Sequence, residues 1–226
     1  MSEEPEFKRY IKEKISGSTI VATLRKKYDI IRLQKKIMFD AYFGLTGFSE
    51  ESSLRLREEE GNLEVTLKIY SFITNEGKIE RKEFNRPVDV CQRLGIAWQI
   101  DLRQLASDLL CRYGLNFIVR QKRTRALIED VEISLDTVYY HHATGKNIPP
   151  VSNAIGKIFH IARIYEAEIK DDSTEIANSI TTHLCSLGLL GDVCRKTKEQ
   201  IGRDALFRSQ LSAISPGQFD KGSTSH

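Results

Sequence analysis

The sequence predicts an α+β domain built on an antiparallel β-sheet. About eight segments alternate polar and apolar residues with the two-residue period of a strand. Short turn sequences such as Gly61-Asn62 and Glu129-Asp130 join neighbouring segments, as hairpins do. Segments with helical periodicity lie between and after the strands. These three observations favour hairpin-linked strands with inserted helices.

The first half of the chain contains most of the predicted strands. Strand patterns cover residues 4–8, 30–43, 54–57, 63–69 and 79–84, and Asn75-Glu76-Gly77 is expected to form a turn before the last of these. A helical pattern covers residues 18–27. Asp101 is expected to cap a second helix, which buries Leu105 and Leu109 and ends at Gly114.

The second half is predicted to alternate strands with helices. Strand patterns cover residues 116–127, 131–140 and 163–170, and a helix is expected at 152–161. Asp172-x-x-Glu175 resembles a capping box for a helix that runs to about residue 187. Asp192 is expected to cap a further helix.

Length and composition predict one globular unit with helical additions. The 226 residues suffice for a sizeable core, and 40% of them are hydrophobic, which is far from the composition of a disordered chain. We expect a sheet domain over residues 1–172, C-terminal helices over 173–214 that pack on it, and a flexible tail over 215–226.

Several classes of protein are disfavoured by composition. No apolar run reaches the roughly 18 residues of a membrane span, and the acidic start Met-Ser-Glu-Glu-Pro-Glu is unlike a secretory signal. The four cysteines lie far apart and indicate no disulfide framework. The net charge of only +3 gives little reason to expect nucleic acid as a partner. A cytoplasmic protein without a membrane partner is therefore expected.

Charged residues are paired on one face of many predicted strands. Residues two apart on a strand share a face, as Arg55 and Arg57 do. Pairs of carboxylates occur on the first and last strands, and pairs of arginines on strands between them. For any one strand a solvated face is the simpler interpretation. The repetition favours a closed eight-stranded antiparallel barrel with a wet, charged inside.

The charged pairs belong to motifs that follow one another in a definite order. These are Glu4-Pro5-Glu6-Phe7-Lys8, Asp40-Ala41-Tyr42-Phe43, Leu54-Arg55-Leu56-Arg57, Leu67-Lys68, Arg81-Lys82-Glu83, Gln121 to Arg125, and Leu135-Asp136 followed by Glu166-Ala167-Glu168. In this order they resemble the motifs of the triphosphate tunnel metalloenzymes, or CYTH superfamily, which joins class IV adenylate cyclases with thiamine triphosphatases. The resemblance spans about three quarters of the chain.

The resemblance implies roles for individual residues in a triphosphate tunnel within residues 1–172. Glu4, Glu6 and Lys8 would be catalytic. The substrate would be bound by Lys8, Arg55, Arg57, Lys68, Arg81, Lys122, Arg123 and Arg125. Mg²⁺ or Mn²⁺ would be held by Glu4, Glu6, Asp136, Glu166 and Glu168, since hard cations favour oxygen ligands. The exact alignment of the basic motif is open, because Arg123 and Arg125 share a face that Lys122 does not.

The resemblance implies metal-dependent hydrolysis of the terminal phosphate of inorganic triphosphate or a small organic triphosphate. A class IV-type adenylate cyclase is one alternative. A catalytically silent module that binds polyphosphate or a nucleotide is another, although a pure anion binder has no use for the carboxylates. The partner in each case is a small molecule that contains a triphosphate. The oligomeric state is open, with a homodimer as one alternative.

Overall fold

The computed structural model describes residues 7–45, 47–49, 52–73, 78–97, 101–145, 147–169 and 174–214. Nine antiparallel strands form one sheet in the order β5-β4-β3-β2-β6-β7-β8-β1-β9. The strands are β1 (Lys8–Ile11), β2 (Arg32–Phe43), β3 (Ser53–Glu59), β4 (Asn62–Ile73), β5 (Lys78–Phe84), β6 (Leu115–Ile128), β7 (Val131–Ala143), β8 (Ile155–Ile169) and β9 (Leu190–Val193).

The prediction of a closed eight-stranded barrel is wrong, because within the described residues the sheet is open and has nine strands. To close it, β5 would have to pair with a strand at the opposite end of the order. That end is occupied by β9, an additional strand that pairs with β1 on the edge that β8 leaves free. Both edges of β1 are therefore already paired, and neither is free to pair with β5.

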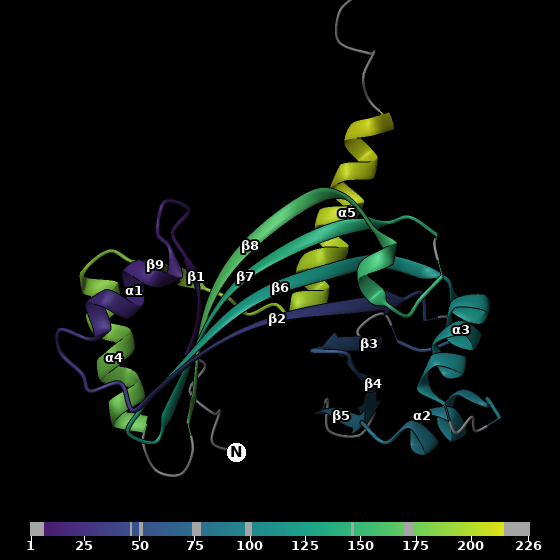
Figure 1. Ribbon diagram of the computed structural model, residues 1–226, viewed down its shortest axis with the longest axis horizontal. Helices are drawn as coiled ribbons and strands as arrows, with labels where there is room; N and C mark the ends of the chain where they lie inside the picture. Colours follow the sequence, from purple (N-terminus) through teal and green to yellow (C-terminus); the bar gives the residue numbers. More distant parts are fainter. Residues whose placement is uncertain are drawn as a thin grey trace, which may run out of the picture.

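Four long strands form the middle of the sheet and set its shape. In Figure 1, β2, β6, β7 and β8 run as twisted ribbons between one group of helices and another. Tight turns fix the register of two hairpins in the sheet, β6–β7 and β3–β4. Glu129 adopts a φ of 51° between β6 and β7, and Glu60 and Gly61 adopt φ values of 52° and 82° between β3 and β4. The hairpins predicted at these two places are confirmed.

Helices cover the two ends of one face, here called the outer face. At one end, α2 (Pro87–Leu94) and α3 (Leu102–Tyr113) pack on apolar side chains of β2, β3, β4 and β6. At the other end, α1 (Gly17–Leu24) and α4 (Thr174–Ser186) pack on β7 and β8. The predicted cap at Asp101 and the helix end at Gly114 are confirmed, since the Asp101 carboxylate accepts a hydrogen bond from the amide of Arg103.

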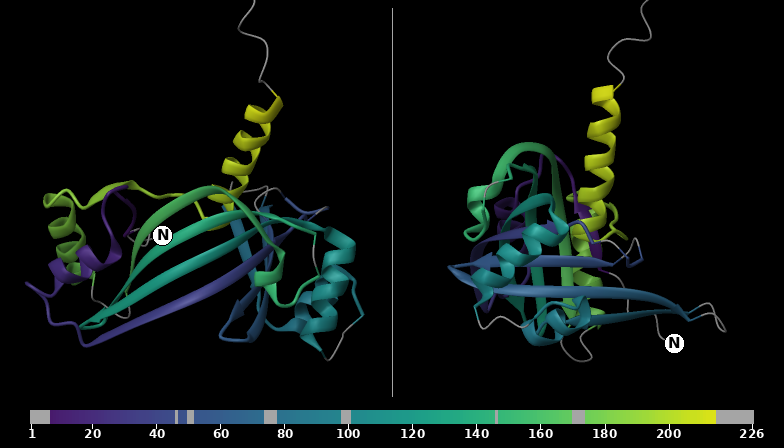
Figure 2. Two further views of the ribbon diagram at one scale, coloured as in Figure 1. Left: turned by 45° about the horizontal axis from the view of Figure 1, so that its top comes forward. Right: turned by 90° about the vertical axis from the view of Figure 1, so that its right-hand side faces the viewer.

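The opposite face, here called the inner face, is approached by the last helix, α5 (Lys198–Ile214). Figure 2 shows α5 against this side of the sheet, away from the four other helices. It packs through Ile201 against an apolar cluster that includes Phe117, Tyr140 and Ile164. The first turn of α5 therefore lies next to the polar half of the inner face.

Two predicted helices are wrong in the second half of the chain. Residues 152–161 form only a short 3₁₀ turn, η1 (Val151–Ala154), before β8 begins, because β7 offers pairing partners along nearly all of β8. Asp192 lies in β9, and the helix begins six residues later at Lys198. The chain also contains α2, which periodicity did not indicate. The predicted turn at residues 75–77 lies outside the described residues, as does Asp172.

None of the helices in the described ranges is long and apolar enough to cross a membrane. The four cysteines are free thiols, of which Cys91 and Cys194 are buried.

Candidate functional site

A cavity of about 310 Å³ lies between the inner face and the first turn of α5. Its lining comes from the sheet and from the helix together: Lys8, Tyr42, Ser53, Arg55, Arg57, Thr66, Lys68, Arg123, Glu166, Thr197, Lys198, Glu199 and Gln200. Six of these side chains are cationic and two are anionic. Such a cavity attracts a compact polyanion.

The alternation of β3 aims its two arginines into the cavity. Leu54 and Leu56 are fully buried in the core on the outer face, so Arg55 and Arg57 point inward. Arg57 donates two hydrogen bonds to the buried carboxylate of Asp40, at 2.7 and 2.8 Å. Burial alone would lower the pKa of Arg57, but the hydrogen bonds and charge of Asp40 outweigh it and raise that pKa. Arg57 is thus a fixed, permanently charged group.

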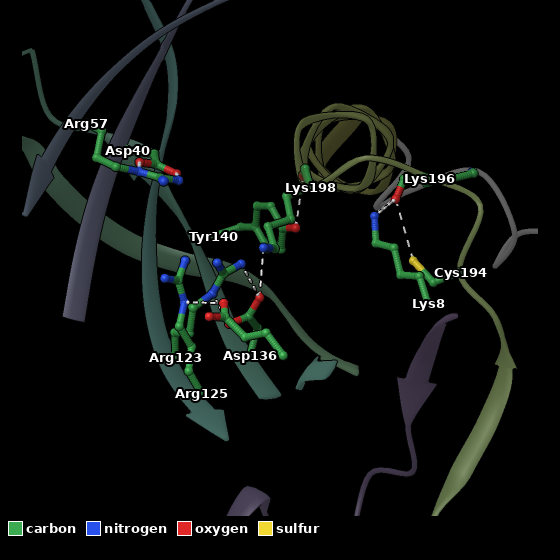
Figure 3. Close-up of polar contacts among 11 residues, drawn as sticks. Lys8, Asp40, Arg57, Arg123, Arg125, Asp136, Tyr140, Cys194, Lys196 and Lys198 are labelled. Carbon is green, nitrogen blue, oxygen red and sulfur yellow. Dashed lines mark hydrogen bonds and ion pairs between the residues drawn. The ribbon is translucent and has the colours of Figure 1, made fainter. Parts of the chain in front are cut away.

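Asp136 on β7 joins a sheet cation to a helix cation. Arg123, its cross-strand neighbour on β6, donates two hydrogen bonds to the carboxylate at 2.8 and 2.9 Å. The ammonium of Lys198 lies 2.8 Å from the same carboxylate (Figure 3). Burial alone would raise the pKa of Asp136, but the charges of Lys198 and Arg123 outweigh it and lower that pKa to about 2.

The low pKa of Asp136 predicts a loss of stability in acid. Its ordinary value is 3.8, so the stabilisation is complete above that pH and is lost as the pH falls towards 2. The expected loss is about 2 kcal/mol of unfolding free energy. Urea unfolding of the wild type and of Asp136→Asn between pH 5 and pH 2.5 checks this. The difference between the two proteins should shrink as the pH falls; a constant difference would contradict it.

Lys8 and Glu166 face each other where β1 pairs with β8. The ammonium of Lys8 donates to the carbonyl oxygen of Lys196 at 2.8 Å, so the segment before α5 fixes this cation at the cavity. The carboxylate of Glu166 makes no hydrogen bond or ion pair with any residue that the structure describes. Its charge acts on Arg123 and Lys198 across the cavity without direct contact, and a carboxylate oxygen placed in this way suits a divalent metal.

The other residues expected in the site lie in different places. Lys68 lines the cavity, 3.3 Å from Glu83. Arg125 lies on the inner face but outside the lining, 3.2 Å from Glu132, and Glu168 is exposed. Lys122 lies on the outer face, with its ammonium 5.6 Å from the ring of Tyr139. Glu4, Glu6 and the side chain of Arg81 lie outside what the structure describes.

The α5 contribution to the cavity was missed from the sequence. Thr197 and Gln200 form a reciprocal cap, in which each backbone amide donates to the other's side chain, at 2.8 and 3.2 Å. This Thr-x-x-Gln spacing is the signal that could have placed the helix start correctly. Thr197, Lys198, Glu199 and Gln200 at the start of α5 line the cavity, and the N-terminus of a helix favours anions.

In the described part of the chain, no three His, Cys, Asp or Glu side chains gather as a metal site. The Asp136 carboxylate has three contacts with Arg123 and Lys198, whereas the Glu166 carboxylate has no such contact with a described residue. The carboxylate of Glu166 has the oxygen donors that a hard cation favours, and the carboxylate of Asp136 is held by two cationic side chains in this arrangement.

Comparisons with known proteins give one family and several distant structures. The CYTH domain profile matches residues 3–185. A putative adenylyl cyclase from Hippeastrum, described as having a dominant triphosphatase activity, is 14% identical over 88% of this chain and 94% of its own, with a TM-score of 0.49. A putative adenylate cyclase from Bacillus halodurans is 17% identical over 86% and 95%, with a TM-score of 0.45. The PH1819 protein from Pyrococcus horikoshii is 18% identical over 87% and 96%, with a TM-score of 0.44.

A comparison with curated protein sequences finds no match. The assignment rests on the family profile, which covers most of the chain and includes every motif noted in the sequence. The chain belongs to the CYTH domain family.

Proposed function

We propose that the protein hydrolyses the terminal phosphate of inorganic triphosphate or a small organic triphosphate with the help of a divalent metal. The observation that carries this proposal is the convergence of six cationic side chains and a helix N-terminus on one cavity of about 310 Å³. A triphosphate carries about four negative charges, so several fixed cations are needed to bind it. Family membership supports the same class of substrate.

The cations that line the cavity are held by polar partners in the protein. Arg57 and Arg123 are each oriented by two hydrogen bonds to a buried carboxylate, Asp40 and Asp136 respectively. Such pre-orientation lowers the entropy lost when a phosphate binds. Arg55 donates a hydrogen bond to Thr66 at 2.9 Å, and Lys198 extends into the cavity from α5. The phosphate chain would therefore be bound by cations of the sheet and of the helix.

Carboxylates would hold the metal, and among the described residues assigned to this role Glu166 lines the cavity. We assign this role to Glu166 and Glu168 on β8 together with Glu4 and Glu6, and we assign Asp136 instead to holding Arg123 and Lys198 in place. Bound Mg²⁺ or Mn²⁺ would neutralise phosphate charge and favour in-line attack by water on the terminal phosphorus. Lys8, opposite Glu166, would add a positive charge between the metal side and the phosphate side.

The lining favours hydrolysis of a small triphosphate over cyclisation of ATP. Among the described lining residues only Tyr42 is aromatic, and the others are charged or hydroxyl- or amide-bearing. A nucleobase would need an apolar or stacking surface, and the ring of Tyr42 is instead buried and stacked on Phe117. The carboxylate of Glu166, which a silent anion-binding module would not need, argues for catalysis.

Phosphate release tests the proposal. Inorganic triphosphate, thiamine triphosphate and ATP are incubated in parallel with the full chain and Mg²⁺, Mn²⁺ or EDTA. We expect release that requires metal and is fastest with inorganic triphosphate. Cyclic AMP formed from ATP without phosphate release would replace hydrolysis by cyclisation, and triphosphate binding without turnover would leave a binding module.

The Glu4→Gln plus Glu6→Gln variant is expected to lose metal-dependent turnover while the protein stays folded. The two amides keep the size of the carboxylates but remove two negative charges that we propose bind the metal. Circular dichroism and phosphate release measured on the same preparation check this. Retained turnover would remove these two residues from the proposed metal set.

A further inference from the structure

Lys198 is held at both ends by one strand. Its ammonium lies 2.8 Å from the carboxylate of Asp136, and its carbonyl oxygen accepts a hydrogen bond of 2.9 Å from the hydroxyl of Tyr140. Asp136 and Tyr140 are four residues apart on β7, so they share the inner face. Figure 3 marks both contacts of Lys198 with dashed lines. The strand thus fixes both the backbone and the side chain of this helix residue.

The ring of Tyr140 is itself locked by neighbouring rings. It is fully buried, and its centroid lies 6.1 Å from that of Phe117, 6.2 Å from that of Phe159 and 5.5 Å from that of His160. We call these four residues the aromatic platform. Because the rings restrict one another, the Tyr140 hydroxyl is a fixed point for the helix above it.

Gly202 determines how closely α5 approaches the aromatic platform. A Cβ atom at this position would lie 2.6 Å from Cε2 of Phe117 and 2.8 Å from Cδ1 of Tyr140, closer than such atoms can approach. A glycine inside a helix lowers helix stability by about 1 kcal/mol relative to alanine. The close contact of α5 with the two rings explains why a glycine is nevertheless found at this position. Gly202 is one turn after Lys198 and lies on the same face of α5.

We propose that Tyr140 and Gly202 are positioning residues that set the depth of α5 on the sheet and thereby place Lys198 at the triphosphate site. This inference rests on the proposed function, since it concerns how the same site is assembled. Neither residue is among those that line the cavity, so each acts through Lys198 and not through contact with the substrate.

The first test is Tyr140→Phe, which removes only the hydroxyl. We expect about five-fold weaker binding of inorganic triphosphate, measured by titration calorimetry in EDTA, because one hydrogen bond that fixes Lys198 is lost. The matched control is Tyr165→Phe. Its hydroxyl is also buried and lies 2.9 Å from Thr181 on α4, on the other side of the sheet. The control should lower the thermal midpoint to a similar degree and leave triphosphate affinity unchanged.

A double-mutant cycle separates positioning from general destabilisation. If Tyr140 acts through Lys198, the Tyr140→Phe change should have no further effect on affinity in a Lys198→Gln background. Gly202→Ala should weaken affinity about ten-fold and speed hydrogen exchange in the first turn of α5. Gly17→Ala is its control, since a Cβ there meets Leu135 at an ordinary 3.7 Å.

The outcomes distinguish this inference from the proposed function. Additive effects in the cycle, or a Gly202→Ala protein with wild-type affinity and exchange, would overturn the inference while leaving triphosphate binding in place. A wild-type chain that binds no triphosphate would overturn the proposed function, and the inference with it. Non-additive loss through Lys198, with both controls unchanged, supports the inference.

Discussion

Replacement of Asp136 by alanine is expected to lower the free energy of unfolding by about 3–5 kcal/mol, because a buried charge pair that loses one partner leaves the other uncompensated. Here two partners are affected. Arg123 and Lys198 both direct their charges at this carboxylate, which has no solvent exposure. Urea unfolding at pH 7 provides the measurement.

The control for Asp136→Ala is Asp204→Ala on α5. Asp204 pairs with Lys196, and their side chains are 43% and 57% exposed. Exposed pairs contribute little, so this variant should stay within about 0.5 kcal/mol of the wild type. Similar losses in the two variants would mean that Asp136 is not the centre of a buried charge network.

Replacement of Lys198 by glutamine is expected to lower kcat/KM for inorganic triphosphate by about 100-fold, comparable with the loss of a single fixed donor at other phosphate or oxyanion sites. The protein should remain folded, because Asp136 keeps both hydrogen bonds from Arg123. Steady-state phosphate release gives kcat and KM separately.

Lys122→Gln is the matched control, since it makes the same chemical change on the outer face of the sheet. Its ammonium lies beside Tyr139 and not at the cavity. We expect a change of less than about two-fold in kcat/KM, within the usual range for surface substitutions. Equal losses in the two variants would indicate a general effect of charge, and a loss confined to Lys122→Gln would place the substrate on the outer face.

The sequence predicted the sheet well because strand alternation is a local signal. The hairpin at Glu129-Asp130 and the helix from Asp101 to Gly114 followed from turn and capping residues. The alternation of Arg55 and Arg57 with buried leucines also placed these arginines on one face. Local patterns of this kind need no knowledge of distant parts of the chain.

Closure of the barrel and the role of α5 depend on long-range contacts and could not be predicted in the same way. The pairing of β9 with β1 joins residues about 180 apart, and nothing in the short segment Leu190–Val193 indicates its partner. Lys198 reaches Asp136 only because Gly202 lets α5 lie on the rings of Phe117 and Tyr140. A lysine in an ordinary helical sequence carries no sign of this role.

The most direct test of the whole account is a crystal structure of the full chain with inorganic triphosphate and Mn²⁺. The account predicts a phosphate chain within hydrogen-bond distance of Arg55, Arg57 and Lys198, with Mn²⁺ bound to Glu166. A triphosphate bound elsewhere, with the cavity filled only by water, would contradict it.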